Sequence, residues 1–214
     1  MQEAWAIREI NDEVIKISKQ FGVKNIIHYG GPGITENGEP IDNFNKYKDL
    51  NEKLKSENLN LVGVESGFFI DPFYWDVVTA GPKRDELIND LIIQIKDMAR
   101  AGVQMLGYTW MPLGPIRTEP KIIRGGSYGT AFDIKSNNLE LAGKNSIKIE
   151  HSNSFPINDI NFLTEEMLWQ NLEYWIKAVT PVAEEEGIRL GIHPDDPPVD
   201  NLGGVPRIMT SFDA

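Results

Sequence analysis

The stretch EEEGIRLGIHPDDPP (residues 184–198) contains the pattern that decides the fold. An acidic helix end is followed by Gly187, then by a short apolar run typical of a buried strand, and then by a polar turn with three prolines. A helix, a short connection, a strand and a polar strand-end loop are the parts of a β/α unit. The same order of parts recurs three more times along the chain.

The sequence therefore predicts four helix–strand pairs. The expected helices cover residues 4–21, 42–57, 83–101 and 164–186, and the expected strands cover residues 23–29, 59–66, 103–112 and 188–194. Nearly continuous apolar strands joined by helices indicate a parallel sheet that is buried on both faces. The stretch 113–163 is rich in Gly, Ser and Asn, so we expect a long loop or a small hairpin there, within a single domain.

Two architectures fit this order, an open doubly wound sheet and a (β/α)8 TIM barrel. The polar residues follow all four strands, which favours a barrel with its site at the carboxyl ends of the strands. The turn GGPG (residues 30–33) also lacks the glycine spacing of an open dinucleotide-binding sheet. A complete barrel takes roughly 250 residues. We therefore expect an incomplete barrel of about four to five β/α units, either a fragment of a longer product or a chain whose missing half comes from elsewhere.

The composition narrows the class of partner. The 214 residues carry a formal net charge of −11, which argues against a nucleic-acid backbone or an anionic membrane as partner. The absence of cysteine excludes disulfides and thiolate metal sites within these residues. We expect a cytoplasmic protein with a small-molecule substrate, and a homo-oligomer because an unfinished barrel leaves apolar edge strands. An anionic substrate would require a local cation.

Polar and aromatic side chains stand where each expected strand ends. His28, Glu65, Tyr108 and the cluster His193-Pro-Asp-Asp would meet at one face of a barrel. His and Glu are natural metal ligands and aromatic rings form walls that face sugars, so this set suits a metal-assisted reaction on a hydroxylated small molecule. A hydrogen-bonded structural role for Glu65 and simple packing for Tyr108 remain alternatives.

His193 is the strongest single candidate because of its neighbours. Three prolines restrict the backbone around it, so the imidazole and the carboxylates of Asp195 and Asp196 are held in place before a ligand arrives. Either aspartate could orient the imidazole toward a metal, and both are candidates for contact with substrate. The alternative is an Asp/Pro turn that simply ends a strand.

Two arginines are candidates for binding an anionic group. Arg117, in GPIRTEP, could grip a substrate carboxylate with a two-pronged contact, and Arg207, in GGVPR, is a second candidate. A solvated loop position is the alternative for Arg117. His151, in the long stretch 113–163, is expected to be a surface residue.

Several blocks together resemble one family, the D-mannonate dehydratases. They are PVAEEEGIRLGIHPDDPP (181–198) followed by GVPRI (204–208), VGVES (62–66), GYTWMP (107–112) and RTE (117–119). The resemblance implies a TIM barrel related to xylose isomerase. It also implies manganese- or iron-dependent loss of water from D-mannonate, which gives 2-keto-3-deoxy-D-gluconate in hexuronate breakdown.

The resemblance further implies that His193 is a metal ligand. The family's other ligands (a Cys, a second His and an Asp) and the His and Tyr of its proton transfers are expected beyond Ala214. Two positions depart from the family's pattern: HYGGPG (28–33) keeps only His28 of a two-histidine turn, and Thr109 stands where Asn is common. Another metal-dependent sugar isomerase or epimerase on the same barrel, and an inactive fragment or binding module, remain alternatives.

Overall fold

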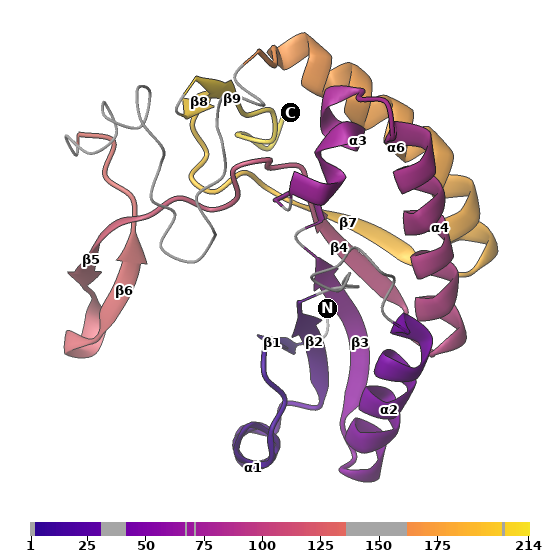
Figure 1. Cartoon of the computed structure of the whole chain (residues 1–214). Helices are drawn as coiled ribbons and strands as arrows, with labels where there is room; N and C mark the ends of the chain where they lie inside the picture. Colours follow the sequence, from indigo (N-terminus) through magenta and orange to yellow (C-terminus); the bar gives the residue numbers. More distant parts are fainter. Residues whose placement is uncertain (1–2, 31–41, 67, 71, 136–161, 203) are drawn as a thin grey trace. The chain divides into compact units, whose positions relative to one another are not determined.

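The structure is a computed structural model that describes residues 3–30, 42–66, 68–70, 72–135, 162–202 and 204–214. The chain divides into two compact units (Figure 1). Unit 1 comprises residues 1–68, 82–108 and 174–193, and unit 2 comprises residues 69–81, 109–173 and 194–214. In these described ranges, no helix combines the length and the apolar character that crossing a membrane requires.

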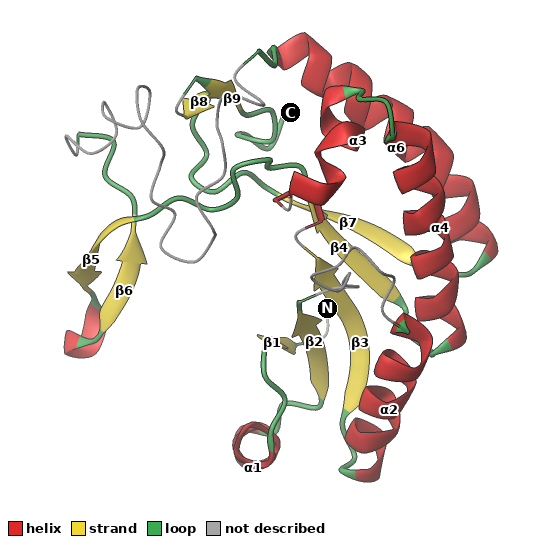
Figure 2. Ribbon diagram, viewed as in Figure 1, coloured by secondary structure: helices red, strands yellow, loops and turns green. Residues whose placement is uncertain are grey.

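Unit 1 is built on a five-stranded sheet, drawn in yellow in Figure 2. In order across the sheet, its strands are β1 (Ala4–Ile7), β2 (Asn25–Tyr29), β3 (Asn60–Ser66), β4 (Met105–Thr109) and β7 (Arg189–His193). The first four strands pair in parallel. Parallel neighbours in chain order with helical connections are the repeating unit of a (β/α)8 barrel. The prediction of a partial TIM barrel is confirmed.

Helices accompany the strands. They are α1 (Asp12–Phe21), α2 (Asn43–Ser56), α4 (Arg84–Arg100) and α6 (Glu165–Glu185). Thr164 caps α6, since its hydroxyl accepts a hydrogen bond from the Met167 N–H at 3.2 Å. In unit 1, α2 packs on β3 and α4, and the core there is closed by fully buried side chains such as Tyr47, Leu54, Val64 and Leu91. The expected bounds of α2 and α4 are right to within one residue.

The prediction of one helix over residues 4–21 is wrong. Residues 4–7 form strand β1, which pairs from Ala4↔Asn25 to Ile7↔His28, and the helix begins only at Asp12. The spacing of the apolar residues fits a helix, but the capping signal lies later in the sequence. Asn11 accepts a hydrogen bond from the Val14 N–H at 3.0 Å, and two acidic residues follow it in the first turn.

Unit 2 contains short elements. The single-turn segment η1 (Phe68–Ile70) lies where unit 1 passes into unit 2. A second single-turn segment, η2 (Pro72–Tyr74), leads into the short helix α3 (Trp75–Thr79). Strands β5 (Thr118–Ile122) and β6 (Tyr128–Ala131) form an antiparallel hairpin around η3 (Arg124–Gly126), and β8 (Asn201–Leu202) pairs with β9 (Val205–Pro206). The expected hairpin in residues 113–163 is therefore present. Residues 136–161, with His151, lie outside the described residues.

Candidate functional site

Glu65 and His193 come together at the carboxyl ends of β3 and β7. His193 Nε2 lies 4.0 Å from Glu65 Oε1, and the two side chains are 38% and 19% exposed. This separation is too long for a direct hydrogen bond, but it suits two donors that share a cation or a substrate hydroxyl between them. The structure brings these two predicted residues together.

Two glycines lie on the same face of the sheet as this pair. Gly107 pairs with Glu65 across β3 and β4, and a Cβ atom there would lie 3.3 Å from Glu65 Cγ. Gly191 points to the same side of β7 as His193, because side chains two residues apart share a face. A Cβ atom at Gly191 would meet no heavy atom within 4 Å. Open space therefore lies at Gly191, on the face of β7 that His193 shares, and position 107 places no side chain against Glu65.

The same face continues onto β2 and β1. Tyr29 pairs with Glu65 on β3, and the Gly30 N–H donates to the Glu65 carbonyl oxygen at 2.9 Å. The guanidinium of Arg8 lies over the Tyr29 ring, 4.9 Å from its centroid. We call this set the strand-end face: Arg8, Tyr29, Glu65, Gly107, Gly191 and His193. Arg8 was missed from the sequence because it falls inside the helix expected there.

His28 lies on the opposite face of the sheet. Its partner on β3 is Val64, not Glu65, and side chains alternate along a strand. The imidazole meets the Tyr47 ring of α2 edge-on, with centroids 6.3 Å apart. Burial lowers the pKa of His28, the Lys46 charge lowers it further, and a backbone hydrogen bond at Arg8 opposes both. The structure does not bring His28 to Glu65 and His193.

Tyr108 also faces away from the strand-end face. It pairs with Ser66, one position past the Glu65–Gly107 pair, so its side chain leaves the sheet on the other side. Its ring packs edge-on against Trp175 of α6 with centroids 4.6 Å apart, and only 5% of the residue is exposed. Burial raises the pKa of Tyr108 to about 12. These contacts favour the packing role that the sequence left open.

In unit 2, both aspartates of the HPDDPP turn are paired with arginines. Asp195 and Arg207 form an ion pair of 3.2 Å whose side chains are 1% and 4% exposed. The other oxygen of Asp195 accepts hydrogen bonds from the N–H groups of Ile208 and Met209, at 3.1 and 2.7 Å. Burial raises the pKa of Asp195 and lowers that of Arg207, and their mutual attraction opposes both shifts.

Arg117 pairs with Asp196 through Nη1 and Nη2, and the Nη1–Oδ1 contact measures 2.7 Å. We call Arg117, Asp195, Asp196 and Arg207 the ion-pair cluster. Both Asp195 oxygens already accept hydrogen bonds within unit 2, so the geometry favours a structural role for Asp195. Substrate contact by Asp195, Asp196 and Arg117 stays a prediction from the sequence. Arg207 is turned inward and also donates to the Gly114 carbonyl oxygen at 2.7 Å.

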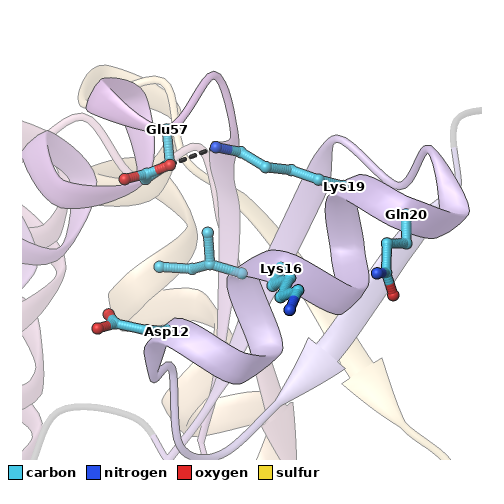
Figure 3. A pocket seen from close by; sticks show the side chains of 6 residues that line it. Asp12, Lys16, Lys19, Gln20 and Glu57 are labelled. Atoms are coloured by element: carbon cyan, nitrogen blue, oxygen red, sulfur yellow. Dashed lines mark hydrogen bonds and ion pairs between the residues drawn. The ribbon is translucent and has the colours of Figure 1, made fainter.

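A hollow of about 440 Å³ in unit 1 is lined by α1 and by the residue after α2 (Figure 3). It is crossed by the ion pair between Lys19 and Glu57, and its lining includes no residue of the strand-end face. Its lining combines polar and charged side chains with the buried Ile15, and none of these residues was singled out from the sequence as a site residue. Within the described ranges, no group of three or more His, Cys, Asp or Glu side chains is placed to hold a metal. The strand-end face contributes two side chains that can ligate a metal, His193 and Glu65.

Known proteins resemble this chain over most of its length. The model of the family described as D-mannonate dehydratase (UxuA) matches residues 4–214. A mannonate dehydratase of Streptococcus pneumoniae (strain 70585) is 33% identical over 186 residues, which cover 82% of this chain and 49% of that protein. One from Streptococcus suis (strain 05ZYH33) is 32% identical over 186 residues, with the same coverage.

A solved structure agrees with these relatives. The crystal structure of mannonate dehydratase from Streptococcus suis serotype 2 superposes with a TM-score of 0.78 at 28% identity, covering 100% of this chain and 57% of that one. The chain spans about half the length of the curated relatives that it matches. With a family model that matches nearly every residue, the conclusion is direct: this chain belongs to the D-mannonate dehydratase family.

Proposed function

We propose that the natural protein containing this chain is a metal-dependent hydro-lyase that dehydrates D-mannonate to 2-keto-3-deoxy-D-gluconate. One observation carries the proposal: in a chain of this family, His193 Nε2 and Glu65 Oε1 stand 4.0 Å apart on one face, beside the space left at Gly191. That arrangement suits a small polar ligand. The Streptococcus relatives are named for the same reaction.

His193 and Glu65 are the residues that would hold a divalent metal. Imidazole nitrogen and carboxylate oxygen are both ligands of Mn²⁺ and Fe²⁺, and the open space at Gly191 leaves room for an ion and a substrate. Such an ion would supply Lewis-acid chemistry, which makes a hydroxyl group a better leaving group. Further ligands are proposed to come from the part of the relatives' length that this chain does not match.

The residues of this chain bind the substrate and orient it. Glu65 offers carboxylate oxygens to substrate hydroxyl protons, and the Gly30 N–H holds the Glu65 backbone at 2.9 Å, so the strand end is fixed. Gly107 keeps the side next to Glu65 free of a side chain. The general base that removes the C2 proton is proposed to lie beyond the residues of this chain.

The test is an assay of the natural-length protein with D-mannonate and Mn²⁺ or Fe²⁺. We expect a 2-keto-3-deoxy acid to form, and a chelator to abolish its formation. The His193→Ala variant should lose at least about a hundredfold in activity. Turnover of an aldose or ketose in place of D-mannonate would contradict the proposal. The 214-residue chain tested beside it shows whether these residues suffice.

Three broader assignments accompany this function. We propose that the protein works in hexuronate breakdown and in the cytoplasm, consistent with a sequence that has no cysteine. We also propose that it forms a homo-oligomer without nucleic-acid or membrane partners. Strands β1 and β7 are the outer strands of the described sheet, and exposed strand edges favour association.

A further inference from the structure

We infer that Arg8 binds the carboxylate of the substrate and so selects sugar acids over neutral sugars. The inference rests on the proposed function and adds to it the group that recognises the acid. A chain with a net charge of −11 repels an anionic substrate unless a cation stands at the site. Apart from the metal ion proposed above, the cations that this chain itself can place there are its arginines and lysines.

The position of Arg8 follows from the register of the sheet. Ile7, the last residue of β1, pairs with His28, so the next residue along each strand brings Arg8 beside Tyr29. The guanidinium lies over the Tyr29 ring at 4.9 Å from the centroid. Tyr29 pairs with Glu65 in turn. Arg8 therefore lies on the same face as Glu65 and His193.

Among the described residues, Arg8 differs from the two arginines of the ion-pair cluster. Among the described residues, no carboxylate lies within ion-pair distance of Arg8, whereas Arg117 and Arg207 are each paired with an aspartate. An aromatic ring orients a guanidinium without neutralising it, and the N–H donors of the guanidinium stay available in its plane. Tyr29 thus acts as a positioning residue that keeps Arg8 on the strand-end face.

The spacing of the row fits a six-carbon sugar acid. Arg8 and Glu65 stand two strands apart, so their backbones are separated by roughly 10 Å. Five carbon–carbon bonds of about 1.5 Å give an extended chain of roughly 6–7 Å, and a charge-assisted hydrogen bond of about 2.8 Å at each end extends its reach to roughly 12 Å, enough to bridge the two strands. One molecule can hold its carboxylate at Arg8 and its hydroxyl groups at Glu65 and His193.

The test compares Arg8→Gln and Arg8→Lys with a matched control, Arg124→Gln, in the natural-length protein. Arg124 is an exposed arginine of η3 in unit 2, outside the strand-end face. We expect Arg8→Gln to raise KM for D-mannonate at least about tenfold with a smaller change in kcat, because a charge-assisted contact is lost. Arg8→Lys should recover part of the loss. Arg124→Gln should behave as wild type.

Two further measurements separate recognition of the acid from other effects. Mannitol, which has the hydroxyl groups but no carboxylate, should compete equally well in wild type and Arg8→Gln. Tyr29→Leu should raise KM less than Arg8→Gln, and Tyr29→Phe should not raise it. If Arg8→Gln and Arg124→Gln give the same KM in an active enzyme, the inference about Arg8 is overturned while the proposed function stands. If wild type does not turn over D-mannonate, the proposed function fails, and the assignment of Arg8 fails with it.

Discussion

The strand-end face and the ion-pair cluster use the same kinds of side chain in opposite ways. In the cluster, Asp195 and Arg207 are almost completely buried and 3.2 Å apart, and Asp195 Oδ2 and Arg207 Nη2 are hydrogen-bonded to backbone groups. On the face, Glu65 and His193 stand 4.0 Å apart and are partly exposed. A satisfied buried pair stabilises a fold, whereas two separated donors beside open space can take up a ligand.

The division falls within one short motif. His193 ends strand β7 in unit 1, while Asp195 and Asp196 belong to unit 2 and pair with arginines there. Neighbouring residues in HPDDPP therefore have different surroundings: the imidazole lies on the strand-end face, and the carboxylates are paired with arginines in the turn. We therefore expect substitutions in the ion-pair cluster to reduce stability and substitutions on the strand-end face to reduce function.

The largest effect is expected from Arg207→Met. Removing the guanidinium leaves the Asp195 carboxylate buried without its charge partner, which typically costs about 3–5 kcal/mol. Urea unfolding followed by circular dichroism would measure the change. Arg117→Met is the matched control, because the Arg117–Asp196 pair is 29% and 34% exposed and such pairs contribute about 0–1 kcal/mol.

A double variant sharpens this prediction. Arg207→Met combined with Asp195→Asn removes both charges, so it should recover part of the lost stability relative to Arg207→Met alone. Equal free energies of unfolding for Arg207→Met and Arg117→Met would contradict a structural role for the buried pair.

The second effect should appear in metal affinity without a change in stability. We expect Glu65→Gln to weaken Mn²⁺ binding about 10–100-fold in the natural-length protein, because a ligating or orienting carboxylate is lost. Electron paramagnetic resonance of free Mn²⁺ would follow the titration. His28→Gln is the control, since His28 ends a neighbouring strand but faces Tyr47. An equal loss in both variants would contradict the assignment of the two faces.

The sequence predicted the sheet and the strand ends well. Apolar runs bounded by helices placed β2, β3, β4 and β7 to within a few residues, and they placed Glu65 and His193 near strand ends. It could not tell which face of a strand a side chain takes, because one residue of register moves a side chain to the other side of the sheet. His28 and Tyr108 therefore seemed equivalent to Glu65 although they face helices.

Pairing between residues that are distant in the sequence was the second feature that could not be predicted. The ion pairs Arg117–Asp196 and Arg207–Asp195 join residues that no local pattern connects, so the aspartates seemed available to a ligand. Arg8 was missed for a local reason. Trp5, Ile7 and Ile10 have helical spacing, while the parallel pairing with β2 that makes residues 4–7 a strand is a tertiary interaction.

A smaller effect is expected at Gly191, where stability and activity should change in opposite directions. Gly191→Val places a β-branched side chain in a strand and should raise stability by up to about 1 kcal/mol. The same side chain enters the space beside His193, so activity toward D-mannonate should fall about tenfold or more. Ile192→Val, at the neighbouring position on the other face, should leave both unchanged. Full activity in Gly191→Val would show that this space is not used.

The smallest effect concerns pH and lies on the helix-facing side of the sheet. Because burial lowers the pKa of His28 below its ordinary value of 6.5, the unfolded chain takes up a proton at a higher pH than the folded one. Stability contributed by the neutral imidazole is therefore present above pH 6.5 and is lost as pH falls from there through the lower folded value. His28→Gln should remove this part of the pH dependence, and urea midpoints at about pH 8 and about pH 5.5 would measure it. If the urea midpoint changed equally between the two pH values in wild type and in His28→Gln, the imidazole would be as easily protonated in the folded chain as in the unfolded one. That result would contradict its burial beneath α2.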